Sequence, residues 1–159
     1  MEKIIKAKEK FQPIFHKKNG TTVIMWDYEP SYKEGSELPY GHCYQVILPY
    51  KATEQQVYEY ICGIYNKEVD AKILSGMTYN GHMVWLSNEN QMNYQSMFNL
   101  ACQTNGANLP EKVKLGTIDE PYVLELDTLD KVVDFYSNVH KYISDCVAEG
   151  WEKKFKLKQ

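Results

Sequence analysis

The dipeptide Asn80-Gly81 narrows what this chain can fold into more than any other feature of its sequence. Both central residues of a type I′ turn need a positive φ, and Asn-Gly adopts this conformation most readily. A two-residue turn here pairs Tyr79 with His82 and thereby sets the register of both strands. The sequence therefore predicts a tight β-hairpin over residues 77–86.

Side-chain alternation along this hairpin predicts which residues share a face. Val84 and Leu86 fall on one face of the strand, and Trp85 falls on the other. Trp85 then lies opposite Gly76, where the missing side chain leaves room for an indole. We expect Trp85 to be mostly buried between the hairpin and a helix, as the anchor that joins them.

A long helix should precede the hairpin. Thr53 and Gln56 have the spacing of a capping box, in which each side chain bonds the backbone amide of the other residue. Apolar residues then recur at helical intervals as far as Ile73. Gly76 follows the last turn and suits a left-handed C-cap.

A second helix should follow the hairpin at an amide-rich stretch. Either Ser87 or Asn88 can cap this helix, and Asn88 with Gln91 makes the better capping box. Asn90 and Asn93 lie three residues apart, which places both on one face. The plainer interpretation is a polar outer face, and the alternative is that Asn90 and Asn93 contact a partner protein.

The same order of elements then repeats. Residues 111–116 and 121–127 have the pattern of a second hairpin, joined by the loop of residues 117–120. Either Asp127 or Thr128 should cap the third helix. The buried stripe of this helix is expected to contain Val132, Tyr136, Val139, Ile143 and Val147.

The end of the third helix is predicted from a glycine. Gly150 is expected to stop the helix. Trp151 can then fold back onto the last turn as the hydrophobic contact of a Schellman motif. Trp151 is therefore expected to be a structural anchor.

The N-terminal part of the chain lacks helical periodicity. Residues 21–28 and 43–50 are rich in β-branched and aromatic side chains, which indicates strands. The predicted fold class is α+β, with a β-rich N-terminal segment in residues 1–52. A helix–hairpin–helix–hairpin–helix module follows in residues 53–159 and is expected to form one compact unit.

Composition and motifs argue against several functional classes. The net charge is −3 and every basic residue is lysine, which does not favour a nucleic-acid-binding protein. The chain has no glycine-rich phosphate loop, no metal-ligand spacing and no recognisable nucleophile–base pattern. No apolar run is long enough to span a bilayer. We therefore expect no enzymatic activity, cofactor, metal, nucleic acid or membrane partner.

The abundance of aromatic residues favours a protein interface. Aromatic side chains make up 13% of the chain, and Tyr32 and Tyr40 fall in the expected loop between the first two strands. Tyrosine suits interfaces because it combines a large rigid ring with a polar tip. We predict Tyr32, Tyr40, Asn90 and Asn93 as partner-binding residues. The alternative is a tyrosine-rich core that reflects coding bias.

Several short motifs follow one another in a recognisable order. Starting at the end of the first helix they are KIL, YNG, VWLS, ENQ, NY, QTNG, EP, FY and GW, with single residues at Pro110 and Gly116. This order spans residues 72–151, about half of the chain. It resembles a family of domains of unknown function that occurs in tail-fibre and baseplate gene neighbourhoods of phages and prophages of gut bacteria.

The resemblance implies a role in the virion or in its assembly and supplies no catalytic residues. The expected function is a non-enzymatic structural protein of the tail or fibre apparatus, made in the bacterial host cytoplasm and located in the virion. Its expected partners are tail, fibre or baseplate proteins, and self-association is left open. One alternative is a tail-fibre assembly chaperone. Another is a carbohydrate- or receptor-binding module that uses Trp26, Tyr32 and Tyr40.

Overall fold

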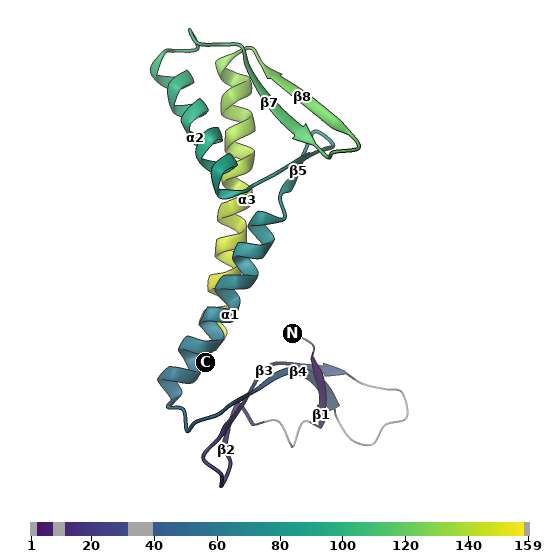
Figure 1. Ribbon diagram of the computed structural model, residues 1–159, viewed down its shortest axis with the longest axis vertical. Coiled ribbons are helices and arrows are strands. Elements are labelled where there is room, and N and C mark those ends of the chain that lie inside the picture. Colours follow the sequence, from purple (N-terminus) through teal and green to yellow (C-terminus); the bar gives the residue numbers. More distant parts are fainter. Residues whose placement is uncertain (1–2, 8–11, 32–39, 158–159) are drawn as a thin grey trace. The chain divides into compact units, whose positions relative to one another are not determined.

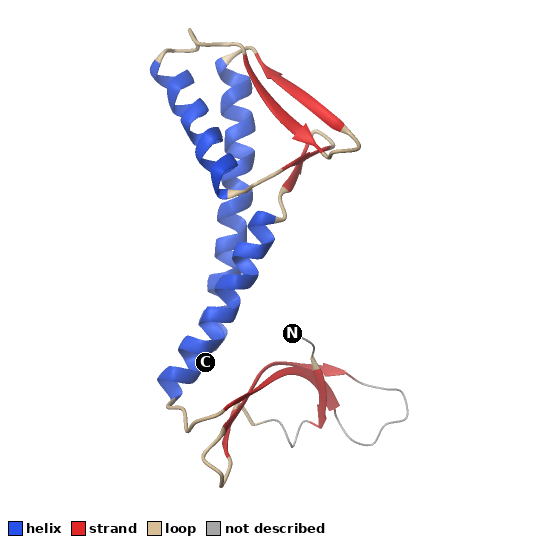
Figure 2. Ribbon diagram, viewed as in Figure 1, coloured by secondary structure: helices blue, strands red, loops and turns tan. Residues whose placement is uncertain are grey.

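The computed structural model describes residues 3–7, 12–31 and 40–157 (Figure 1). The chain forms two compact units, Met1–Cys62 and Gly63–Gln159. Strands dominate the first unit, and helices alternate with hairpins in the second (Figure 2). The expected α+β class is confirmed. The predicted division of the chain between residues 52 and 53 stays a prediction. The two compact units meet between Cys62 and Gly63, inside the first helix.

The first unit contains one antiparallel sheet. Its strands are β1 (Ile4–Ala7), β2 (Ile14–His16), β3 (Thr22–Ser31) and β4 (Tyr40–Leu48). Their order across the sheet is β1-β4-β3-β2. β3 and β4 correspond to the two strands expected from the sequence, and both extend further into the expected loop.

Buried side chains and one hydroxyl hold this sheet. Val23, Met25 and Cys43 form a buried cluster. The hydroxyl of Thr22 donates to the carbonyl of Tyr50 and accepts from the amide of Ala52, both at 2.9 Å. Thr22 is fully buried, and its hydroxyl needs hydrogen-bond partners for that reason. The same two bonds satisfy polar backbone groups where the chain leaves the sheet.

Helix α1 (Glu54–Leu74) has the ends that the sequence predicted. The amide of Thr53 donates to Gln56 Oε1 at 2.9 Å, and the amide of Gln56 donates to Thr53 Oγ1 at 3.3 Å. Gly76 has φ +83°, as a left-handed residue after the helix requires. The capping box and the glycine C-cap are confirmed.

The first hairpin also has the predicted turn and register. β5 (Met77–Tyr79) and β6 (His82–Val84) are joined by Asn80 and Gly81, at φ 49° and 82°. Tyr79 pairs with His82, as expected. The Tyr79 hydroxyl donates to Asp134 Oδ2 at 2.6 Å, which ties the hairpin to the third helix.

Helix α2 (Asn88–Gln103) begins with a different cap from the preferred one. Ser87 is the N-cap, and its hydroxyl accepts from the amide of Asn90 at 3.2 Å. The predicted box of Asn88 with Gln91 is wrong, because Asn88 is already the first helical residue. The side chain of Gln91 donates instead to the carbonyl of Leu86 at 2.7 Å.

The second hairpin and the third helix follow as predicted. β7 (Glu111–Gly116) pairs with β8 (Pro121–Leu126) over their whole length. Thr128 is the N-cap of α3 (Leu129–Lys156), the longest described helix. Thr128 is thus the correct member of the two candidate caps.

Gly150 does not end α3, and the prediction of a Schellman ending with Trp151 is wrong. The helix continues to Lys156, and Trp151 lies inside it with half of its surface exposed. A Cβ atom on Gly150 would lie 2.5 Å from Cγ2 of Val69 in α1. The glycine therefore allows close helix packing rather than a turn.

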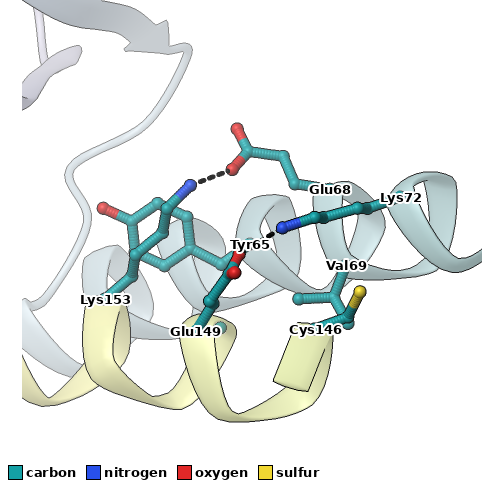
Figure 3. Close-up of a pocket in the computed structure, with 8 residues that line it drawn as sticks. Tyr65, Glu68, Val69, Lys72, Cys146, Glu149 and Lys153 are labelled. Carbon is teal, nitrogen blue, oxygen red and sulfur yellow. Dashed lines mark hydrogen bonds and ion pairs between the residues drawn. The ribbon is translucent and has the colours of Figure 1, made fainter. Parts of the chain in front are cut away.

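The close contact between α1 and α3 is flanked by ion pairs on its surface (Figure 3). Lys153 Nζ lies 2.8 Å from Glu68 Oε2, and Lys72 pairs with Glu149. A small hollow lies between these pairs, and Cys146 is among the residues that line it. These exposed pairs add little stability, so the apolar contact holds the helices together.

The core of the second unit is built around α3. The buried residues that α3 contributes are Val132, Phe135, Val139, Cys146 and Gly150. Phe135 packs edge-to-face against the rings of both Tyr79 and Tyr94, with centroids 5.2 Å apart in each case. The predicted stripe is partly wrong: Tyr136 and Ile143 are half-buried and Val147 is exposed. The buried stripe contains Phe135 in place of Tyr136 and Cys146 in place of Val147. Phe135 faces the first hairpin, and Cys146 faces α1.

Candidate partner-binding surface

The structure describes three of the four residues predicted to bind a partner, namely Tyr40, Asn90 and Asn93. Tyr32 lies outside the described residues. Tyr40 is the first residue of β4, where it pairs with Ala7 and Ser31, so its prediction as a loop residue is wrong. Its side chain is half-buried. Tyr40 belongs to the first unit, whereas Asn90 and Asn93 belong to the second.

Asn90 and Asn93 differ in their surroundings. The Asn90 side chain is half-buried, and its amide donates to the carbonyl of Trp85 at 3.1 Å. Asn93 is exposed on the next turn of α2. Asn90 therefore stabilises the connection between β6 and α2, and only Asn93 of the two presents its amide outward.

Trp85 is not buried between the hairpin and a helix, and that prediction is wrong. Its side chain is 47% exposed, whereas its neighbours Val84 and Leu86 are fully buried. The space opposite Gly76 is occupied by the carbonyl of Val84, which a Cβ atom on the glycine would strike. With that space filled by backbone, the indole lies toward the second hairpin.

Trp85 is nevertheless held at both its backbone and its ring. Its indole N–H donates to the carbonyl of Gly116 at 2.7 Å. Its own carbonyl accepts from Asn90 Nδ2 at 3.1 Å and from the Tyr94 hydroxyl at 3.3 Å. The Tyr94 hydroxyl is protonated at neutral pH, and burial raises its pKa further above the ordinary value. The exposed part of the ring is therefore presented in a fixed orientation.

A second contact joins the two hairpins. The rings of His82 in β6 and Tyr122 in β8 stack in parallel, with centroids 3.7 Å apart and planes 2° apart. Tyr122 remains 38% exposed. The stack and the indole bond therefore fix the two hairpins against each other and leave aromatic surface in contact with solvent.

The loop of the second hairpin carries an exposed apolar side chain. Ile118 is 98% exposed. The loop is closed by two bonds at 3.1 Å, from the Thr117 amide to the Glu120 carbonyl and from the Glu120 amide to the Thr117 hydroxyl. Gly116 has φ +83°, and a Cβ atom there would strike the Glu120 carbonyl. The backbone thus holds Ile118 outward in a tight loop.

We define the hairpin-junction surface as His82, Trp85, Ile118 and Tyr122. These residues come from two hairpins that the stack and the indole bond join. Acidic residues, Asp119 and Glu120, follow Ile118 in the exposed loop. The surface therefore offers aromatic and aliphatic area beside negative charge, which is the chemistry of a protein-binding patch.

Sequence reasoning missed this surface for identifiable reasons. The hairpin pattern predicts Trp85 as a buried anchor, and it predicts residues 117–120 only as the loop that joins two strands. The apolar Ile118 between Gly116 and the acidic pair was the available signal, since a loop residue with no core to enter stays exposed.

Trp26, one of the three residues proposed for a carbohydrate- or receptor-binding site, is not accessible to a ligand. Trp26 is buried in β3, with 3% of its surface exposed, and packs beside Tyr44 with ring centroids 5.5 Å apart. Its ring face is therefore closed to a ligand. The carbohydrate-binding alternative loses Trp26 for this reason.

The described residues hold neither a cluster of metal ligands nor a membrane-spanning helix. In residues 3–7, 12–31 and 40–157, no group of three or more His, Cys, Asp or Glu side chains is placed to hold a metal ion. None of the helices in these same ranges is both long enough and apolar enough to cross a membrane. No family model, curated protein or solved structure matches the chain.

Proposed function

We propose that this chain is a non-enzymatic structural protein of a phage tail or fibre apparatus, which binds another virion protein through the hairpin-junction surface. One observation carries the binding part of the proposal: Ile118 is almost completely exposed in a loop that its own hydrogen bonds hold closed. When a partner covers an apolar side chain, its removal from water lowers the free energy of the complex. The order of sequence motifs supports the virion context.

The chemistry of the surface indicates what the partner presents. Ile118 needs an apolar pocket, and the exposed parts of Trp85 and Tyr122 add aromatic area on the two hairpins. Asp119 and Glu120 favour lysine or arginine at the rim of that pocket. A tail, fibre or baseplate protein with such a pocket is the expected partner.

The test compares two matched substitutions. Ile118→Thr removes apolar area from the hairpin-junction surface, and Ile47→Thr makes the same chemical change at a β4 residue that is 50% exposed. Both variants and the wild type are assayed by calorimetry against purified phage tail, fibre and baseplate proteins. We expect Ile118→Thr to weaken binding at least tenfold, about 1.4 kcal/mol, and Ile47→Thr to leave it unchanged.

Particle composition distinguishes the structural role from its alternatives. Mass spectrometry of purified virions should detect the chain. Binding to a fibre protein together with absence from the particle would indicate an assembly chaperone. Failure of every virion protein to bind would overturn the proposal, and glycan-array binding in its place would indicate a carbohydrate-binding module.

A further inference from the structure

Strand β8 has one paired edge and one open edge. It pairs with β7 along its whole length, and no other described strand pairs with it. In Figure 1, β8 forms the outer side of the second hairpin. Tyr122 of the hairpin-junction surface lies on this strand. The open edge is therefore continuous with the surface to which we assign partner binding.

The turn of the second hairpin determines which backbone groups of β8 face the open edge. The Thr117 amide donates to the Glu120 carbonyl at 3.1 Å, so these two residues form a bonded pair. Bonded and non-bonded pairs alternate along an antiparallel ladder. In the register of β7 and β8, this alternation turns the N–H and C=O groups of Val123 and Glu125 away from β7. Pro121 also falls at an outward position, where its missing N–H removes no bond to β7.

β8 lacks the features that prevent strand addition in many proteins. Edge strands are commonly protected by bulges or by free charges. The pairing of β7 with β8 runs from Glu111 to Gly116 without a bulge. Glu125, the one charged residue of β8, pairs with Lys112 of β7 at 3.6 Å. Val123 is 59% exposed, so the centre of the edge presents an apolar side chain beside open backbone.

The chemistry of this edge specifies the conformation of the segment that covers it. Within the described ranges, no backbone group accepts a hydrogen bond from the amides of Val123 and Glu125. These two residues place donors and acceptors two residues apart along a line, which matches the backbone of another extended chain. A helix bonds its backbone groups internally and leaves only those at its ends free, so it cannot satisfy this row. The edge therefore fits an added strand.

A second copy of β8 fits this edge poorly. Two-fold antiparallel pairing brings outward residues of the two copies opposite each other. Glu125 opposite Glu125 places two carboxylates together, which destabilises a sheet. Val123 opposite Val123 uses Pro121, which has no N–H to donate. Val123 opposite Glu125 sets each carboxylate beside a valine, without a basic side chain from the other copy.

We propose that the virion partner adds an extended strand to the open edge of β8. This inference rests on the proposed function and specifies how the same partner binds. Cross-strand pairing places a lysine or arginine of the partner strand opposite Glu125 and an apolar β-branched residue opposite Val123. Asp119 and Glu120 in the adjoining loop attract the same positive charge. The added strand thus holds the partner in register while its pocket covers Ile118.

Hydrogen exchange at single amides tests the pairing directly. The full chain is measured alone and with each purified phage tail, fibre or baseplate protein that binds it in calorimetry. In the free chain, the amides of Val123 and Glu125 should exchange about tenfold faster or more than those of Tyr122 and Leu124, which bond to β7. In the complex, exchange at Val123 and Glu125 should slow by about tenfold or more.

The outcomes separate this inference from the proposed function. If a virion protein binds through Ile118 and the amides of Val123 and Glu125 stay unprotected, strand addition is wrong and the proposed function stands. If none of the virion proteins binds, both fail.

A proline substitution supplies a second test. Val123→Pro removes an outward N–H and leaves the bonds between β7 and β8 in place. It should weaken partner binding about tenfold or more, which corresponds to about 1.4 kcal/mol. The matched control Val123→Thr keeps the N–H and the branched shape and should bind within about threefold of the wild type. Circular dichroism verifies that both variants fold. Equal binding of the wild type and a folded Val123→Pro chain would overturn the proposal, and the exchange measurement decides if this variant does not fold.

Discussion

Replacing Gly150 by alanine tests the contact that joins α1 to α3. In a helix interior, Gly→Ala normally stabilises by about 1 kcal/mol, because alanine has the higher helix propensity. At Gly150 the new Cβ would lie 2.5 Å from Val69 Cγ2. That is roughly 1 Å inside ordinary van der Waals contact. Overpacking of this kind costs about 1–3 kcal/mol, so the net effect is a loss of about 0–2 kcal/mol.

The neighbouring side chain has little freedom to relieve the overlap. Val69 is β-branched and lies inside α1, where valine has one strongly preferred rotamer. Truncating it in the double variant Gly150→Ala, Val69→Ala should recover part of the loss. The two changes should therefore be non-additive, as expected for residues in direct contact.

Gly63 is the matched control. It also lies inside α1, but a Cβ atom there would meet nothing within 4 Å. Gly63→Ala should therefore stabilise by the full ~1 kcal/mol. The measurement is urea unfolding followed by circular dichroism at the helix band for five chains: the wild type, Gly63→Ala, Gly150→Ala, Val69→Ala and the double variant. If Gly150→Ala stabilises as much as Gly63→Ala, α1 and α3 do not approach closely at this point, and the packing argument fails.

Three further predictions concern single hydrogen-bonding side chains. Trp85→Phe removes the bond to Gly116 and should cost about 1 kcal/mol in urea unfolding; a loss of 3 kcal/mol or more would indicate a buried ring instead. Burial, reinforced by the bond to Asp134, raises the pKa of Tyr79 to about 12. Because this pKa exceeds the ordinary value of 10.0, the protonated Tyr79 hydroxyl stabilises the folded state fully below about pH 10, and this contribution is lost as the pH rises to about 12. The Tm of the wild type should therefore fall over this pH range, and Tyr79→Phe should make that fall smaller. Thr22→Val leaves two backbone groups without their partner and should cost about 1–3 kcal/mol, and an unchanged Tm would contradict that.

Features set by neighbouring residues could be predicted from the sequence. The turn at Asn80 and Gly81 and the capping box of Thr53 with Gln56 depend on backbone geometry within four residues. Each signal requires no knowledge of the rest of the chain. The order of helices and hairpins in the second unit follows from such local signals, and so it was predicted correctly.

Features set by distant residues could not be predicted. A glycine such as Gly150 is typical of a helix end, but its role here is set by its contact with Val69, which is far away in the sequence. The position of Trp85 depends on the carbonyl of Gly116 in another hairpin. Asn90 was expected to face outward, but the carbonyl of Trp85 accepts from its amide. In each case a residue type permits two roles, and a tertiary contact selects one.

The central position of α3 also has a consequence for the order of events during synthesis. α1, both hairpins and α2 leave the ribosome before α3, yet the side chains that complete their core belong to α3. Tyr94 therefore lacks its ring contact with Phe135, and Val84 and Leu86 lack the apolar side chains of α3, until the first half of this helix has been translated. At roughly 5–20 residues per second, its 28 residues take at least a second to appear. The second unit should consequently fold after translation of α3, and it should depend most on chaperones during that interval.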